Sequence, residues 1–577
     1  MNHTGGQKKQ RAFDTEGLIE RLLIIGMLLF FFIFLFMPIV MMFGHAFEDD
    51  LGNYVGLENF RTYFATPTLA GSLWHSLTVS LITAALSTLT GLLFAYGITR
   101  TNIRGGRFYR YAALLSLFVP TMVHGMALVY IFGRTGFVTK ILKIDIGLYG
   151  FKGVVMAELF YTFPQAFTVL AVALENADNR LYESAEVLGA GPVRSFFEVT
   201  LPSIRYGLIN SFIVCFTLSF TDFGAPEVVG GNYGVLATDI FRQVAGQQKM
   251  SMGAVVGIVL TIPAVLSFVV NLLMQKKNER SQLSSKAVAL QIVPSRGRDV
   301  FYQIFCTVIV ACIFLMIGAV FLAAFATNWP YKMQPTLKHF DFGAALYGTG
   351  AVSFLNSFWL SFGTAALGTA IVFLFAYLIE KTRVMPHLRS ICRFLSLIPM
   401  ALPGLVLGLG YIMFFNKPVI RVFGAAIPNP FTGMYGTFSI MIFCTIIHMF
   451  SVTFVTAETA LQKLDREYEN VAQSINVPFW KIFGRVSLPM SINAVAEIFM
   501  YYFVNSMVTV SAIVFLFTPQ NKPASIAILN MDDNGDFAAA AAMSILILLI
   551  NIGVRLVYEV INVRLVKKLD AWKAGVI

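Results

Sequence analysis

Polar side chains within long apolar stretches are the residues of this chain most able to do chemistry. A buried polar group is costly in a lipid bilayer, so such side chains are functional candidates by default. Two sets stand near the ends of corresponding apolar stretches and would line a pathway for a solute: Ser219, Thr221 and Asp222, and Asn505, Ser506 and Thr509. Asp222 would attract an ammonium group and repel a phosphonate. Alternatively, Asp222 caps a helix end and binds no solute.

A second polar set lies in other apolar stretches: Glu158, Tyr161 and Thr162, and Thr445 and His448. Hydrogen bonds between helices would explain these side chains equally well, because such bonds are favoured in lipid. His124 and His448 each stand alone in their stretches, which favours packing or a pore-facing position over metal ligation.

The sequence contains no catalytic constellation. It has no G-x-x-x-x-G-K-[ST] phosphate loop, no HExxH, no GxSxG and no Cys/His cluster with metal spacing. We therefore predict no catalytic residue, no metal site and no cofactor bound by this chain. An energy source for transport must then lie on another polypeptide.

Composition places these residues in a membrane. Of 577 residues, 57% are hydrophobic and 13% are charged, and mean hydropathy is +0.72, so the chain is too apolar for a set of soluble domains. The net charge of +11 could suggest nucleic acid, but the basic residues lie in short loops between apolar stretches, where they set membrane orientation. The sequence predicts a multi-pass membrane protein that binds no nucleic acid.

Twelve apolar stretches have about the 20 residues needed to cross the hydrocarbon. We place them at residues 21–43, 76–98, 111–133, 151–174, 206–225, 251–274, 301–324, 353–379, 393–415, 434–460, 491–517 and 538–560. Loops rich in Lys and Arg, such as 100–110 and 381–393, are expected in the cytoplasm by the positive-inside rule. Both termini are then cytoplasmic, and the polar stretch 275–300 is a cytoplasmic linker.

The two halves of the chain repeat one another. The aligned pairs are 76–96 with 357–377 and 178–202 with 465–489. We therefore predict two six-span halves, 1–274 and 301–577, related by a pseudo-twofold axis.

The repeated polar segment 178–202 has the features of a docking element. Leu181, Ala185 and Leu188 share one side of a short helix, and Gly189 permits a left-handed turn into a second helix. Such a knob fits a groove on a soluble partner. The alternative is a helix resting on lipid headgroups, which the recurrence of the segment in the second half disfavours.

The residues of this segment resemble those of a known family. Glu183-Ser-Ala185, followed by Gly189 and then Leu201-Pro202, is similar to the coupling loop, or EAA loop, of bacterial binding-protein-dependent ABC importer permeases. The resemblance implies that an ATPase is contacted by Glu183, Ala185, Gly189, Leu201 and Pro202.

The second copy departs from the family pattern. Ala472, Leu488 and Pro489 are kept, but Asn470 and Asn476 stand where the glutamate and the glycine belong, with Glu469 one position away. We expect unequal docking sites, with Glu183 mattering more than its counterpart. Trp480 offers the second copy an aromatic anchor.

The resemblance extends over almost the whole chain and implies the fold of a type I ABC importer permease. That fold is all-α, with about twelve transmembrane helices in two pseudo-twofold halves. The implied partners are a homodimer of ATPase subunits that holds ATP and Mg²⁺, an extracytoplasmic solute-binding protein and the lipid bilayer of the bacterial inner membrane. Loops such as 44–75 and 226–250 would receive the cargo.

Four further segments of the sequence suggest the cargo by their resemblance to one branch of the family. Residues 220–226 (FTDFGAP), 235–240 (VLATDI), 252–257 (MGAVVG) and 530–533 (NMDD) look like the 2-aminoethylphosphonate branch of fused permeases. Two alternatives stay open. One is a ferric-iron permease of the same class, and the other is a secondary transporter driven by an ion gradient, which also commonly has twelve spans and internal repeats.

Overall fold

The computed structural model describes residues 4–282, 292, 294–342, 350–422, 425–465, 467–475 and 477–575. Helices dominate this part of the chain, with two short β-hairpins. Seven helical segments are long and apolar enough to cross a membrane, and five further pairs of helices would each do so as one bent span, giving up to twelve. The predicted helical membrane fold is thus confirmed, with the two hairpins as its only β-sheets in the described residues, and each predicted stretch overlaps one of these segments.

The helices in the first part of the chain are α1 (Thr4–Phe31), α2 (Met37–His45), α3 (Glu58–Ala65), α4 (Pro67–Arg100), α5 (Gly106–Leu114), α6 (Thr121–Phe132), α7 (Phe151–Glu175), α8 (Asn179–Val187), α9 (Pro192–Ser195), α10 (Leu201–Ser203), α11 (Arg205–Thr221), α12 (Gly224–Val229), α13 (Leu236–Phe241) and α14 (Met250–Gln282). Those in the later part are α15 (Arg296–Phe325), α16 (Gly350–Lys381), α17 (Pro386–Leu397), α18 (Gly404–Phe415), α19 (Phe438–His448), α20 (Phe450–Gln462), α21 (Glu467–Ser474), α22 (Phe479–Ile482), α23 (Leu488–Met490), α24 (Ile492–Val508), α25 (Ala524–Asp533) and α26 (Phe537–Gly575).

Short turns of 3-10 or π geometry are η1 (Phe32–Phe36), η2 (Leu115–Phe118), η3 (Val138–Leu142), η4 (Phe196–Thr200), η5 (Arg242–Gly246), η6 (Lys338–Phe340), η7 (Ile398–Ala401), η8 (Thr432–Met434) and η9 (Phe483–Ser487). The antiparallel hairpins pair β1 (Ala326–Asn328) with β2 (Lys332–Pro335) and β3 (Val419–Val422) with β4 (Ala425–Pro428).

Five of the predicted spans are bent, which hydropathy alone did not reveal. The two sharpest bends are 100° before α6 and 111° before α18. Each of these helices begins directly after a proline in extended conformation, Pro120 (ψ 149°) or Pro403 (ψ 142°). Proline has no N–H to continue the preceding helix, so the chain breaks there although both sides are equally apolar.

The predicted linker 275–300 is shorter in the structure, because helices enter it from both ends. α14 continues to Gln282 and α15 begins at Arg296. The polar residues that extend α14 are good helix formers, so the helix outlasts its apolar stretch. Residues 283–291 and 293 lie outside the described part of the chain.

Contacts divide the chain into two compact units. Unit A comprises Ala46–Ala351 and Ser525–Leu548, and unit B comprises Met1–His45, Val352–Ala524 and Leu549–Ile577. The first span of each sequence half therefore belongs to the unit built mainly from the other half. The predicted boundaries 1–274 and 301–577 describe the sequence repeat, which differs from this division into compact units.

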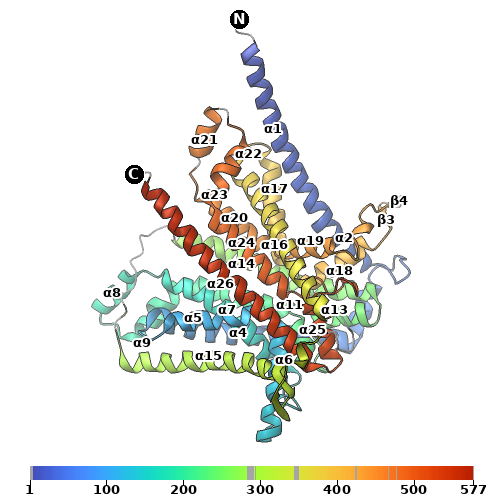
Figure 1. The fold of residues 1–577 in the computed structure, drawn as a ribbon, viewed down its shortest axis with the longest axis vertical. Helices are drawn as coiled ribbons and strands as arrows, with labels where there is room; N and C mark the ends of the chain where they lie inside the picture. The colour runs from blue at the N-terminus through green and yellow to red at the C-terminus, as the bar shows by residue number, and fades with distance from the viewer. Residues whose placement is uncertain are drawn as a thin grey trace. The chain divides into compact units, whose positions relative to one another are not determined.

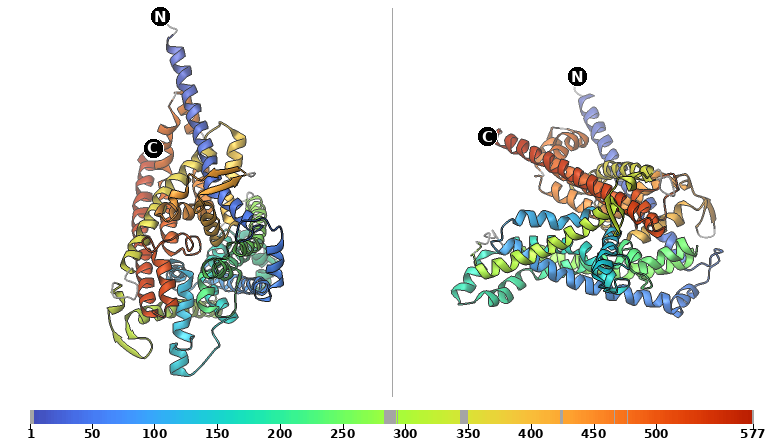
Figure 2. Two further views of the ribbon diagram at one scale, coloured as in Figure 1. Left: turned by 90° about the vertical axis from the view of Figure 1, so that its right-hand side faces the viewer. Right: turned by 60° about the horizontal axis from the view of Figure 1, so that its bottom comes forward.

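Unit A has α4, α7 and α11 at its centre, with α5 and α15 packed beside α4 (Figure 1, Figure 2). A Cβ placed on Gly91 of α4 would lie 2.8 Å from the Cβ of Ala166 on α7, so glycine permits this close approach. The hydroxyls of Ser87 and Thr162 lie 2.6 Å apart across the same contact. α15 is tied to α5 by the hydroxyls of Tyr109 and Thr307, 2.8 Å apart.

Unit B includes α16, α18, α20 and α24; α2 packs on α18, α20 packs on α24, and Gly368 of α16 lies against Tyr502 of α24. The Tyr411 hydroxyl of α18 donates to the main-chain carbonyl of Phe34 at 2.7 Å. The Thr453 hydroxyl of α20 donates to the Tyr502 hydroxyl of α24 at 2.9 Å. Phe31 packs edge-on against Phe450, with ring centroids 5.1 Å apart, so the first span is held by both polar and aromatic contacts.

Candidate functional site

The coupling segment of unit A is a helix, a tight turn and a second, irregular helix. Asp178 caps α8 by accepting a hydrogen bond from the Arg180 N–H at 3.1 Å. After α8, Gly189 adopts φ +75°, and the N–H of Ala190 donates to the Ala185 carbonyl at 2.9 Å. The chain then continues through α9, η4 and α10. The predicted sequence of helix, left-handed glycine and helix is therefore confirmed.

The coupling segment of unit B has the same architecture. Asp465 accepts a hydrogen bond from the Glu467 N–H at 3.0 Å, and the N–H of Val477 donates to the Ala472 carbonyl at 2.9 Å. The elements α21, α22, η9 and α23 follow one another as α8, α9, η4 and α10 do in unit A. Asn476, which stands at the glycine position, lies outside the described residues.

Both coupling segments present exposed apolar side chains. In unit A, Leu188 is 82% exposed and Leu181 is 51% exposed, and in unit B, Ile475 is 66% exposed and Trp480 is 46% exposed. Ala185 and Leu201 are half-buried, and Pro202 and Pro489 are exposed. In unit A, α8 and α9 lie at one end of the helical layer (Figure 1). Apolar groups gathered in this way mark an interaction surface.

A buried base at the end of the second span holds each coupling helix in place. In unit A, Arg100 donates to the Leu174 carbonyl at 2.5 Å and lies over the ring of Tyr182, 5.1 Å from its centroid. In unit B, Lys381 forms an ion pair with Glu469 at 3.4 Å. Tyr182 and Glu469 occupy the same place in the repeat, as do Arg100 and Lys381.

Sequence reasoning missed these anchors, because it treated the bases at the ends of spans only as signals of orientation. The signal that could have found them is their place in the repeat. Arg100 and Lys381 each follow the aligned Tyr96 and Tyr377 by one helical turn.

The exposed acid of the coupling helix differs between the units. Glu183 is exposed, and its Oε1 accepts a hydrogen bond from the Asn179 amide at 2.7 Å. In unit B, Glu469 is only 8% exposed and faces Lys381, whereas Asn470 is exposed and accepts a hydrogen bond from Arg383 at 2.7 Å. Glu469 therefore does not replace the missing surface glutamate, and the inequality of the two docking sites stays a prediction.

Asp222 caps a helix and also contacts a second carboxyl. Its Oδ2 accepts a hydrogen bond from the Ala225 N–H at 2.9 Å. Asp222 therefore has the geometry of a helix cap, as the structural alternative predicted. The carboxyl of Glu158, fully buried on α7, lies against that of Asp222. Neither Glu158 oxygen has a hydrogen-bond partner in the described part of the chain. Two carboxyls this close repel one another when both are ionised, so the arrangement favours a proton or a cation beside them.

The remaining pathway candidates are divided between the units. Ser219 and Ser506 are buried at matching places in α11 and α24, and neither hydroxyl has a hydrogen-bond partner among the described residues. Thr221 and Asn505 bond to carbonyls of their own helices, at 2.9 Å and 2.8 Å. Thr509 is buried directly after α24. The structure thus places these side chains at the carboxyl ends of two equivalent helices, and their pathway role stays a prediction.

In the second polar set, two threonines form hydrogen bonds, and one of these bonds joins two helices as the structural alternative predicted. Thr162 bonds across helices to Ser87, whereas the hydroxyl of Thr445 donates to the Met441 carbonyl of its own helix at 2.8 Å. Both nitrogens of His124 and the Nδ1 of His448 have no partner within the described ranges.

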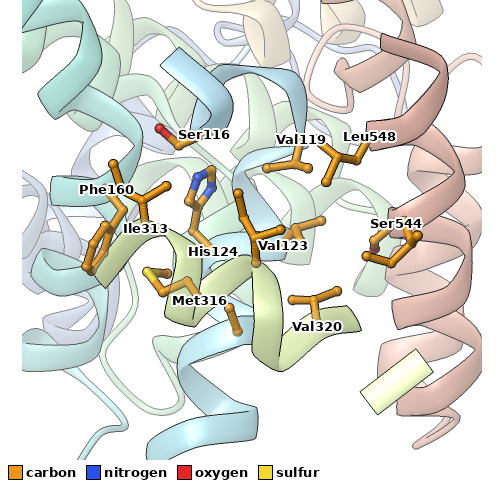
Figure 3. A pocket seen from close by; sticks show the side chains of 13 residues that line it. Ser116, Val119, Val123, His124, Phe160, Ile313, Met316, Val320, Ser544 and Leu548 are labelled. Carbon is orange, nitrogen blue, oxygen red and sulfur yellow. The ribbon is translucent and has the colours of Figure 1, made fainter. Parts of the chain in front are cut away.

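Figure 3 shows the surroundings of His124 in unit A. The ring lies in a mainly apolar pocket between α6, α7, α15 and α26, with Val123, Phe160 and Met316 around it. No group of three His, Cys, Asp or Glu side chains in the described part of the chain could hold a metal ion.

The short helices α13 and α25 lie at the end of unit A opposite α8 and α9 (Figure 1), and they carry partly or fully buried acids, as α12 does. Burial raises the pKa of Glu227 on α12 and of Asp239 on α13. Burial also raises the pKa of Asp532 on α25 to about 7, with a contribution from the nearby charge of Asp533. α12 and α13 belong to the 226–250 region in which cargo is expected to arrive.

These features, a helical membrane chain with two anchored, apolar coupling segments, define a class of transport protein. The chain belongs to the family of binding-protein-dependent transport system inner membrane components, which matches residues 87–281 and 373–567. It is thus a multi-pass permease of an ABC importer, with one family match in each half of the sequence. The alternative of a gradient-driven secondary transporter is set aside by this finding. The orientation of the termini stays a prediction.

Similar proteins include the ferric transport system permease protein FbpB of Actinobacillus pleuropneumoniae. It is 27% identical over 94% of this chain and 78% of its own length. The putative ferric transport system permease protein FbpB 1 of Haemophilus influenzae is 27% identical over 88% of this chain and 79% of its own length. Among solved structures, a bacterial ABC transporter involved in the import of the acidic polysaccharide alginate matches 47% of this chain and 98% of its own, with 18% identity and a TM-score of 0.37.

Gly189→Val is expected to lower ATP-dependent transport about five- to thirtyfold. A Cβ at this position would meet nothing within 4 Å, so the cost is backbone strain alone, about 1–2 kcal/mol for a side chain at positive φ. Gly189→Asn is the matched control, because asparagine tolerates this conformation and is the residue of the second copy. Uptake in cells with equal amounts of permease measures the effect, and equal losses in both variants would contradict it.

Proposed function

We propose that this permease imports ferric iron, received from an extracytoplasmic binding protein and driven by a pair of ATPase subunits. The two coupling segments carry the permease mechanism, because they are anchored to their own units by buried bases and expose apolar side chains outward. A change in a docked partner would be transmitted through Arg100 and Lys381 into the second span of each half. The ATPase homodimer, and the ATP and Mg²⁺ it would hold, are part of this proposal.

Two observations favour a cationic cargo. The relatives that match most of the chain are named for ferric transport, which supports the iron alternative better than the phosphonate prediction. Within unit A, the fully buried carboxyl of Glu158 lies close to that of Asp222, and a carboxylate there would oppose a free oxyanion. Hard cations take oxygen ligands such as carboxylates. The acids of α12, α13 and α25 add further carboxyl groups at the end of the unit where cargo is expected.

The cation would pass through unit A without a closed coordination site. No group of three metal-ligating side chains lies within the described ranges. The ligands of the ion would therefore be the carboxyls of Glu158 and Asp222, together with water. Weak, open ligation suits a pathway, because an ion held tightly would not leave.

A second candidate cargo is 2-aminoethylphosphonate. It is favoured by residues 220–226 and 235–240, which look like that branch of the family. Its ammonium group could meet the Glu158–Asp222 pair, but its phosphonate would need donors elsewhere.

Calorimetry on the cognate binding protein separates the two cargoes. Tight binding of ferric iron and no binding of 2-aminoethylphosphonate would support the proposal. The reverse result would overturn the iron assignment and leave the permease class unchanged.

Glu158→Gln is expected to reduce uptake of a cationic cargo about tenfold, since the amide keeps the side-chain volume but cannot become an anionic oxygen ligand beside Asp222. The matched control is Glu175→Gln, which alters an exposed partner of Arg110 and should change uptake less than twofold. The measurement is radiolabelled iron uptake at equal permease levels. Unchanged uptake in Glu158→Gln would return the pair to a structural role.

A further inference from the structure

A polar pocket of about 400 Å³ opens beside the coupling helix of unit B. The ends of α16 and α20, the start of α17 and the helix α21 line it, and all of these belong to one unit. Its charged lining consists of four bases and two acids: Lys381, Arg383, Arg389 and Arg393, with Glu380 and Glu469. Its volume lies within the range of small-molecule sites, and positive charge exceeds negative charge in its wall.

The acids in the wall are already paired, which leaves part of the positive charge for a ligand. Glu469 pairs with Lys381 at 3.4 Å, and Glu380 pairs with Arg393 at 2.7 Å. Arg383 is exposed and donates to the neutral side chain of Asn470, with no acidic partner in the described part of the chain.

We propose that this pocket binds a phosphate-class oxyanion between Arg383 and Asn470, and so fixes the coupling helix of unit B to the α16–α17 turn. The guanidinium has five donors in a fixed fork, so one edge can hold an anion while another keeps its bond to Asn470. Asn470 accepts from Arg383 through Oδ1, which leaves its amide N–H groups to donate to the same anion.

An anion site would explain why Asn470 stands where the family pattern has a glutamate. A glutamate at position 470 would place a negative charge beside the anion and compete for Arg383, whereas asparagine is neutral and donates. In unit A, the corresponding Glu183 is retained and bonds Asn179. The anion site is therefore a property of the second segment, and it does not depend on the identity of the cargo.

Two sources could supply the anion: a phospholipid headgroup and free phosphate or phosphonate. Both use the same donors, and experiment separates them. The purified full chain is placed in nanodiscs of neutral phosphatidylcholine, and its unfolding midpoint is followed against inorganic phosphate, with chloride matching the ionic strength. A second series replaces part of the phosphatidylcholine by phosphatidylglycerol. Any ligand that binds only the folded chain raises the midpoint.

We expect a rise with phosphate, with phosphatidylglycerol, or with both, and each result names the source. Arg383→Gln and Asn470→Glu should weaken the apparent affinity about tenfold, the loss expected for a charge-assisted hydrogen bond. Arg107→Gln removes an exposed arginine from the corresponding loop of the first half and should leave the rise unchanged. No rise in either series, or an equal rise in wild type and Asn470→Glu, would overturn the proposal.

Discussion

A Lys381→Met permease is expected to lose at least 100-fold in ATP-dependent transport. The substitution leaves Glu469 buried without its ion-pair partner, and breaking a buried pair in this way costs about 3–5 kcal/mol. Glu469 would regain water only by moving out of its buried place, so α21 would lose its anchor to the second span. The measurement is uptake at equal membrane levels of permease, together with the amount of ATPase that co-purifies.

Two further variants separate the ion pair from other effects. Lys463→Met removes an exposed lysine just before the same coupling segment and should be nearly neutral. A double variant, Lys381→Met with Glu469→Leu, replaces both charges by apolar groups and should recover much of the transport, because no unpaired charge remains. If Lys381→Met alone transported normally, the ion pair would not be the anchor of α21.

Leu188→Glu is expected to abolish co-purification of the ATPase without affecting the fold of the permease. Leu188 is 82% exposed, so its own unit loses little when it changes. A carboxylate buried in an apolar interface without a partner is strongly unfavourable, so binding should weaken more than about 100-fold. Pull-down of the ATPase by the detergent-solubilised permease measures the result.

Two control variants test whether the loss of binding depends on the charge and on its position. Leu188→Met keeps an apolar side chain and should bind the ATPase as the wild type does. Leu51→Glu introduces the same charge at an 88% exposed leucine outside the coupling segment and should also bind normally. Full ATPase recovery with Leu188→Glu would exclude α8 as the docking element of unit A.

Local features of this protein were predictable from its sequence. Each apolar stretch was predicted as a span because about 20 apolar residues suffice to cross the hydrocarbon, and each overlaps a long apolar helix or a bent helix pair. The α8 helix and the turn at Gly189 follow from an Asp cap, an amphipathic pattern and a glycine, all within a few residues. The bends before α6 and α18 were missed, although Pro120 and Pro403 stood in the sequence as signals for them.

Contacts between residues far apart in the chain could not be predicted from the sequence. The Lys381–Glu469 pair joins residues 88 apart, and Glu158 meets Asp222 from a different helix. In the alignment, Glu469 looked like a slightly misplaced surface acid, because a linear pattern does not show which way a side chain points. The missing glutamate at Asn470 had no explanation until Arg383 was found beside it.

The sequence by itself determined the class of the molecule, its twelve apolar segments and its two coupling segments, since hydropathy, capping and turn chemistry act over short distances. Only the tertiary structure decided that the first span of each half joins the opposite compact unit, which bases anchor the coupling helices, and which carboxyls meet in the membrane. The reason is that the apolar faces of transmembrane helices are chemically alike, so their pairing depends on the fit of small residues and a few polar contacts. Gly91 against Ala166, and Tyr411 against the carbonyl of Phe34, are contacts of this kind.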